Sequence, residues 1–321
     1  MISTNRIFNC YKDELKYQIY SKTLLLIFII SISLAAINLY GLVSKAEGAY
    51  DVYVRTYNEF KDAGIDVEAM LKSPLNRDIK QTGSDRLTKV DNPVRFQFEE
   101  AGIASQLLKG PNIITNTLEW LDFVFFPIIF TLLGIHFVSY DYKYKTYKLK
   151  VIKAKWNKLF AGKLFALFTC TFFIFISTLI ASYIIGLYFH SQVVNRIPLE
   201  QFSSLPQIDN NKLIIQLVFS LFICIFFALI GFLMGILFKS FILPTIIFLV
   251  FNLILPVLGK YDIRNMIAII SHEIFEFKGR FILFMPAYIP LYQSITLLVA
   301  IAILIIAASF LYLSRQGKYY N

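Results

Sequence analysis

Long stretches without a charged side chain recur along the chain and alternate with polar segments. Six of them lack Asp, Glu, Lys and Arg: 24–43, 123–140, 164–189, 213–238, 241–258 and 291–313. A helix needs about 20 mostly apolar residues to cross the hydrocarbon core of a bilayer. The pattern therefore predicts an all-α integral membrane protein with six transmembrane helices. The second and fifth stretches are the shortest and contain prolines, so kinked, tilted or broken helices are expected there.

Lysine and arginine set the orientation, because cytoplasmic loops carry an excess of these residues. With the N-terminus inside, the cytoplasmic segments carry a net charge of +12 and the outer segments carry −2. The cytoplasmic segments are 1–23, 141–163, 239–240 and 314–321. The sequence therefore predicts that both termini lie in the cytoplasm (N-in, C-in).

The N-terminal segment has a helical pattern of its own. Residues 1–23 place Ile7, Tyr11, Leu15 and Ile19 four positions apart, with charged residues elsewhere around the helix. This spacing predicts an amphipathic helix that lies in the cytoplasmic interface. A solvated tail is the alternative.

The outer segments differ in length and pattern. Segment 44–122 combines mixed charges with Gly and Pro, which predicts a small, mostly helical extracellular domain. Segment 190–212 is expected to be an extracellular loop. In 259–290, apolar residues from Ile263 to Phe277 share one helical face, Arg264 lies off that face, and a second apolar stretch follows. We expect a helical hairpin that dips into the outer leaflet before the sixth span.

Composition agrees with a membrane protein. Only 16% of the residues are charged, against roughly 25% in soluble proteins. The chain lacks a G-x-x-x-x-G-K-[ST] loop for ATP, and Glu276 stands where an H-E-x-x-H zinc motif starting at His272 needs its second His. We expect no enzymatic activity, cofactor, metal site or nucleic-acid partner, and no disulfide among Cys10, Cys170 and Cys224.

Polar and small residues within the spans are few. Candidates for lining a transport path are Asn38, His136, Gln216 and Asn252, with a helix-packing hydrogen bond as the alternative for each. A small-residue face for close helix contact, within one chain or between two, consists of Ala228, Gly231 and Gly235.

The basic segment 141–163 is the most distinctive part of the sequence. It contains eight lysines and a tryptophan, more than orientation alone needs, so we expect a short helix that docks into a groove of a cytoplasmic partner. The positive-inside rule by itself is the alternative. The candidate coupling residues are Asp141, Thr146, Lys153, Lys155, Trp156, Asn157, Lys158 and Lys163.

At these residues the chain resembles the permease subunits of type-2 ABC exporters. In that family a carboxylate, three residues and Gly-Thr follow the second span, and a Gly-Lys pair begins the third. The matching residues here are Asp141, Thr146, Gly162 and Lys163, and Lys145 stands where the family has Gly. The layout of an N-terminal interfacial helix, six spans and a hairpin before the last span is also similar.

This resemblance implies the membrane half of an ATP-driven exporter in a bacterial cell membrane. Two permease chains, identical or homologous, would form the path, and separate ABC ATPase subunits would hold ATP and Mg²⁺ and bind segment 141–163. Because the spans carry no buried charge, we expect a hydrophobic or amphipathic substrate: a membrane-active peptide, a lipid-like molecule or a drug.

Two other functions compete with this interpretation. The chain could be a non-transporting membrane sensor whose 44–122 domain binds an extracellular ligand. A membrane-embedded lipid-modifying enzyme is disfavoured, because no cluster of carboxylates or histidines marks a reaction centre.

Overall fold

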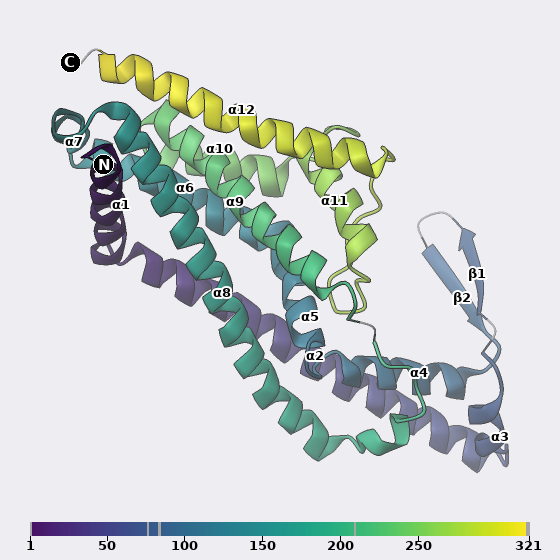
Figure 1. The fold of residues 1–321 in the computed structure, drawn as a ribbon. Helices are drawn as coiled ribbons and strands as arrows, with labels where there is room; N and C mark the ends of the chain where they lie inside the picture. The colour runs from purple at the N-terminus through teal and green to yellow at the C-terminus, as the bar shows by residue number, and fades with distance from the viewer. Residues whose placement is uncertain (1, 76, 83–84, 209, 319–321) are drawn as a thin grey trace.

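The computed structural model describes residues 2–75, 77–82, 85–208 and 210–318, which are mostly helical (Figure 1). The α-helices are α1 (Ile2–Tyr20), α2 (Thr23–Asp62), α3 (Val67–Lys72), α4 (Pro93–Gln106), α5 (Asn112–Trp120), α6 (Phe126–Lys143), α7 (Tyr147–Lys153), α8 (Trp156–Arg196), α9 (Leu213–Phe238), α10 (Ile242–Leu249), α11 (Ile263–Ile274) and α12 (Leu291–Lys318). The shorter elements are the π-helical turns η1 (Leu121–Phe125) and η3 (Val250–Ile254), the 3₁₀ helix η2 (Leu199–Phe202) and the antiparallel strands β1 (Arg77–Thr82) and β2 (Asp85–Val90).

Within this described part, five helices are long and apolar enough to cross a membrane, which indicates a multi-pass membrane protein. They are Thr23–Asp62, Asn112–Lys143, Trp156–Arg196, Leu213–Phe238 and Leu291–Arg315. The predicted fifth span instead forms a shorter apolar helix, Ile242–Ile254, about 20 Å long at 1.5 Å per residue. Leu255 leaves this helix in the extended conformation that a residue before proline favours.

Two of the long helices extend well beyond the spans predicted for them. Helices α2 and α8 contain 40 and 41 residues, so each is about 60 Å long, twice the thickness of a hydrocarbon core of about 30 Å. Beyond the first predicted span, Ala46, Tyr53 and Tyr57 continue a helical face of α2 that packs into a core of its own. The polar composition after Val43 therefore marks a change of surroundings and not the end of the helix.

Buried apolar side chains among the described residues form two clusters. One lies between α6, α8 and α9 and contains most of the buried phenylalanines. The other joins the far half of α2 to α3, α4, the last turns of α8 and η2, and includes Tyr53, Phe98, Val193 and Phe202. Segment 44–122 is thus mostly helical with one β-hairpin, and it shares its core with residues of segment 190–212.

Small residues let α6 and α9 approach at close backbone distance. A Cβ atom at Gly231 would lie 2.0 Å from the carbonyl oxygen of Thr131, and one at Gly134 would lie 2.1 Å from that of Ala228. Gly235 also faces α6. The small-residue face of α9 therefore packs within the chain.

The prediction of a helical hairpin in 259–290 is correct for the first helix and wrong for the second. Helix α11 is present, but residues 281–285 have no helical structure. Pro286 and Pro290 lack the N–H donors that a helix would need here. Asn265 binds this segment instead, because its side-chain amide donates to the Ala287 carbonyl (2.9 Å) and accepts from the Ala287 N–H (2.8 Å).

Arg264, expected off the packed face of its helix, is buried with 6% of its surface exposed. Its guanidinium donates to the carbonyls of Phe251, Leu255 and Pro256 at 3.1, 2.6 and 2.7 Å. These acceptors lie at the end of η3, where helix carbonyls lack partners of their own. Burial tends to raise the pKa of Asp262, but hydrogen bonds from Arg264 and backbone amides lower it below its usual value.

Candidate functional site

The start of α1, the end of α12 and segment 141–163 lie at one end of the molecule (Figure 1). The segment folds as the end of α6, the short helix α7 and the first turns of α8. Helix α1 packs on α8 at this end. Residues from distant parts of the sequence are thereby brought together.

Four charged side chains form a buried ion-pair cluster between these elements. The Lys150 Nζ atom of α7 lies 2.7 Å from a carboxylate oxygen of Glu14 and 2.7 Å from one of Asp141. The Lys163 Nζ atom of α8 lies 2.9 Å from Glu14 and 2.7 Å from Asp141. Each ammonium thus bridges both carboxylates, which offsets the cost of removing these charges from water. Because Asp141 and Lys163 are buried, they hold the segment in place and do not contact a partner directly.

The end of α6 supports this cluster through a Schellman motif. The Thr146 N–H donates to the Asp141 carbonyl, the Lys145 N–H donates to the Tyr142 carbonyl, and the Thr146 hydroxyl donates to the Asp141 carboxylate at 2.9 Å. The motif requires a left-handed residue, and Lys145 has φ 55°. Glycine adopts this conformation most readily.

Gly162 lets α1 lie directly on α8. A Cβ atom there would lie 2.7 Å from the Cys10 Cβ. The face of α1 turned toward the protein contains Glu14 and Gln18, which are buried, whereas Ile19 of the predicted apolar stripe is 64% exposed. Helix α1 is therefore held by polar contacts as well as apolar ones. Burial raises the pKa of the Cys10 thiol, and the nearby Glu14 carboxylate raises it further.

Other candidate coupling residues lie at the surface of the same region. Lys155 and Asn157 are exposed at the start of α8, and Lys158 is half-buried. The side chain of Lys153 lies outside the described part of the structure. Lys155, Asn157 and the exposed Leu149 of α7 are thus available to a partner.

Trp156 differs from the free anchor expected from the sequence. It is half-buried, and its ring packs on Phe310 of α12 with 4.9 Å between ring centroids. The Phe160 ring also packs on Phe310, with 5.5 Å between ring centroids. Trp156 therefore joins the start of α8 to the last helix of its own chain.

Sequence reasoning missed two members of the ion-pair cluster, Glu14 and Lys150. Glu14 resembles an ordinary surface charge on an amphipathic helix, and Lys150 is one of eight lysines in its segment. A usable signal was the scarcity of acids, since the predicted cytoplasmic segments contain only Asp13, Glu14 and Asp141. Two of these three carboxylates lie in the cluster.

The four candidate path-lining residues hydrogen-bond to neighbouring segments, which is the packing role given as their alternative. Their partners are the Asn116 carbonyl for Asn38 (3.0 Å), the Thr23 hydroxyl for His136 (2.9 Å), the Thr115 hydroxyl for Gln216 (2.9 Å) and the Val124 carbonyl for Asn252 (3.5 Å).

Two buried carboxyl groups lie in the apolar helix that contains the second predicted span. This helix begins at Asn112, so it includes Glu119 and Asp122, which are both buried. Glu119 accepts a hydrogen bond from the Phe277 N–H at 2.9 Å, and Asp122 accepts one from the Ser220 hydroxyl. The absence of acids within 123–140 does not extend to the whole helix.

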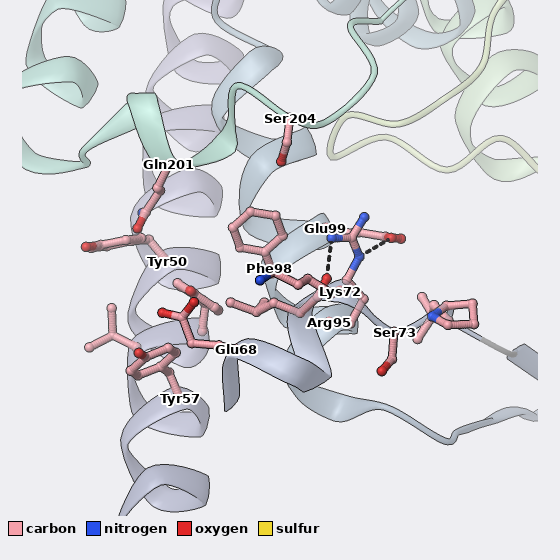
Figure 2. A pocket seen from close by; sticks show the side chains of 15 residues that line it. Tyr50, Tyr57, Glu68, Lys72, Ser73, Arg95, Phe98, Glu99, Gln201 and Ser204 are labelled. Carbon is pink, nitrogen blue, oxygen red and sulfur yellow. Dashed lines mark hydrogen bonds and ion pairs between the residues drawn. The ribbon is translucent and has the colours of Figure 1, made fainter. Parts of the chain in front are cut away.

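A pocket of ≈ 880 Å³ lies at the opposite end of the molecule, between α2, α3 and α4 (Figure 2). Tyr50 and Tyr57 form one wall, and Glu68 points between them. On the other side Arg95 pairs with Glu99 at 2.9 Å. The pocket thus combines aromatic rings with charges of both signs.

No protein-family model, curated protein or solved structure matches this chain. The function is therefore inferred from the geometry of the chain itself.

Proposed function

We propose that the chain is the membrane-spanning permease subunit of an ATP-driven exporter of the type-2 ABC class. One observation carries this proposal: three of the four residues that match the family motif, Asp141, Thr146 and Lys163, contact one another in the fold. Asp141 pairs with Lys163, the Thr146 hydroxyl donates to the Asp141 carboxylate, and Gly162 allows the close contact between α8 and α1. The pairing of Asp141 with Lys163 joins the two ends of the motif, which a chance similarity of a short segment would not require.

The ion-pair cluster suggests how force would pass from a cytoplasmic partner to the membrane. Lys150 links α7 to α1 and α6, and Lys163 links α8 to the same two helices. A push on α7 from closing ATPase subunits would therefore move α1, α6 and α8 together. We propose that this movement alternately opens a path between two permease chains to the two sides of a bacterial cell membrane.

The proposed topology has six crossings with both termini in the cytoplasm. The five long helices supply five crossings, and the short helix Ile242–Ile254 with the chain that follows supplies the sixth. Exposed apolar side chains line much of the long helices, which favours a hydrophobic or amphipathic cargo moving beside the lipid.

A second candidate function is an extracellular sensor, and the pocket in Figure 2 favours it. Aromatic walls with a few placed charges are typical of small-ligand sites. The two functions differ in their need for a partner, because only the exporter requires an ATPase.

Co-purification tests the exporter proposal. The chain is expressed with the P-loop ATPase encoded beside it, if the neighbouring reading frame encodes one, and is isolated through its own affinity tag. We expect a stable complex that hydrolyses ATP, and no hydrolysis by the chain alone. A neighbouring frame without an ATPase, or a chain that exports a substrate without one, would contradict the proposal.

A further inference from the structure

A second large pocket lies where three parts of the chain meet at the end that holds the ion-pair cluster. Its volume is ≈ 800 Å³. The end of α1 contributes Tyr20, the last turns of α6 contribute Tyr140 and Lys143, and the turn between α9 and α10 contributes Lys239 and Ser240. The pocket lies beside the ion-pair cluster but shares no residue with it.

The charge of this pocket is positive and uncompensated. None of the described residues that line it is acidic. Lys143 and Lys239 are exposed, and neither has an ion-pair partner in the described part of the chain. The nearby Asp141 carboxylate is already bridged by Lys150 and Lys163. Two lysines therefore line the same pocket, and no described residue in its lining supplies a counter-charge.

The ammonium group of each of these lysines lies over the aromatic ring of a tyrosine that also lines the pocket. The Lys143 Nζ atom lies 5.3 Å from the centroid of the Tyr144 ring, and the Lys239 Nζ atom lies 5.9 Å from that of Tyr142. Cation–π contacts of this length orient a cation without neutralising it. Hydroxyl groups of Tyr20 and Ser240 add uncharged hydrogen-bond donors.

Apolar surface continues directly from the pocket along α10. Phe241 and Ile242 line the pocket, Ile242 is 70% exposed, and Leu243 and Ile246 are exposed beyond it. A basic pocket lined by hydroxyl-bearing residues, next to a helix with exposed apolar side chains, matches a molecule with an anionic head and an apolar tail.

We propose that this pocket binds the phosphate group of an anionic phospholipid, with the acyl chains lying along α10. Basic pockets between transmembrane helices on the cytoplasmic side recognise such headgroups. The proposal rests on the multi-pass character of the chain and on the proposed orientation with the termini in the cytoplasm, and it does not depend on the exporter function.

Binding of short-chain lipids to the purified full-length chain in detergent tests the proposal. The probes are dioctanoyl phosphatidylglycerol, dioctanoyl phosphatidylcholine and inorganic phosphate, with affinity measured by microscale thermophoresis. The test variant is Lys143→Gln with Lys239→Asn, since Asn tolerates the left-handed backbone that Lys239 has at φ 52°. The control is Lys260→Gln, an exposed lysine that lies over Tyr261 at 5.0 Å and is distant in sequence from the pocket.

We expect the wild-type chain and the control to bind phosphatidylglycerol alike, and the double variant to bind it at least about tenfold more weakly. Phosphatidylcholine and inorganic phosphate should bind much more weakly than phosphatidylglycerol. Unchanged affinity in a double variant that elutes as a folded monodisperse protein would overturn the proposal. If phosphatidylcholine binds as tightly as phosphatidylglycerol, the pocket does not select for negative charge and the proposal fails. If inorganic phosphate binds as tightly as phosphatidylglycerol, the ligand is free phosphate and not a lipid.

Discussion

Lys163 and Glu14 form a buried ion pair with 2.9 Å between Nζ and the carboxylate, although 149 positions separate them in the sequence. The pair connects the N-terminal helix to the start of α8. Lys150 reaches the same carboxylate from α7. The N-terminal helix is therefore an integral part of the proposed coupling site and not only a membrane-surface anchor.

Loss of Lys163 should destabilise the chain strongly. Lys163→Met leaves two buried carboxylates with Lys150 alone, so we expect a loss of about 3–5 kcal/mol in the free energy of unfolding. Lys158→Met, on the same helix but half-buried and outside the cluster, should change it by less than about 0.5 kcal/mol. Denaturant unfolding in detergent measures both values. Equal stability of the two variants would show that the cluster contributes nothing.

Position 145 should prefer glycine. Because Lys145 has a left-handed backbone, Lys145→Gly should be more stable than Lys145→Ala by about 1 kcal/mol. This order is the reverse of the one expected inside a regular helix. Thermal unfolding of the two variants gives the comparison, and an Ala variant as stable as the Gly variant would contradict the Schellman motif.

Two glycines should respond to alanine with opposite signs. Gly231→Ala would place a Cβ atom 2.0 Å from the Thr131 carbonyl and push α6 and α9 apart, for a loss of about 1–3 kcal/mol. Gly48 lies inside α2 with open space around it, so Gly48→Ala should stabilise the chain by about 0.5–1 kcal/mol. Unfolding measurements on both variants check the pair, and a harmless Gly231→Ala would argue against the close packing.

Trp156 should be coupled energetically to Phe310. A double-mutant cycle with Trp156→Leu and Phe310→Leu should give an interaction energy of about 0.5–1.5 kcal/mol in unfolding experiments on the chain alone. If the two substitutions have additive effects on the free energy of unfolding, the contact contributes nothing, and Trp156 is then free to anchor a partner.

Apolar periodicity predicted the helical class and the approximate positions of the long helices, because transmembrane helices need long uncharged stretches. It failed where polar residues continue a helix. Beyond Val43 the helix α2 runs on to Asp62, since Tyr53 and its neighbours bury a face against another part of the protein. Apolar residues from Ala46 to Phe60 recur at helical spacing on the buried face, so this pattern indicates the continuation that the search for uncharged stretches missed.

The sequence predicted only those residues of the candidate site that lie within one short segment of the chain. The motif residues Asp141, Thr146 and Lys163 follow from one short segment, but their partner Glu14 comes from a helix distant in sequence. Trp156 was expected to anchor a cytoplasmic partner, and its contact with Phe310 was not predicted because the two residues lie on helices distant in sequence. Such pairings depend on tertiary packing, which spacing within one segment does not encode.

Site-specific photo-crosslinking tests the central claim most directly. A photoreactive phenylalanine analogue replaces Asn157, which is exposed at the start of α8, or Ser73, which is exposed at the opposite end of the molecule. The chain is then irradiated in complex with the neighbouring ATPase. We expect a crosslink to the ATPase from position 157 and none from position 73. A complex that forms but crosslinks only from position 73, or from neither position, would contradict coupling through segment 141–163.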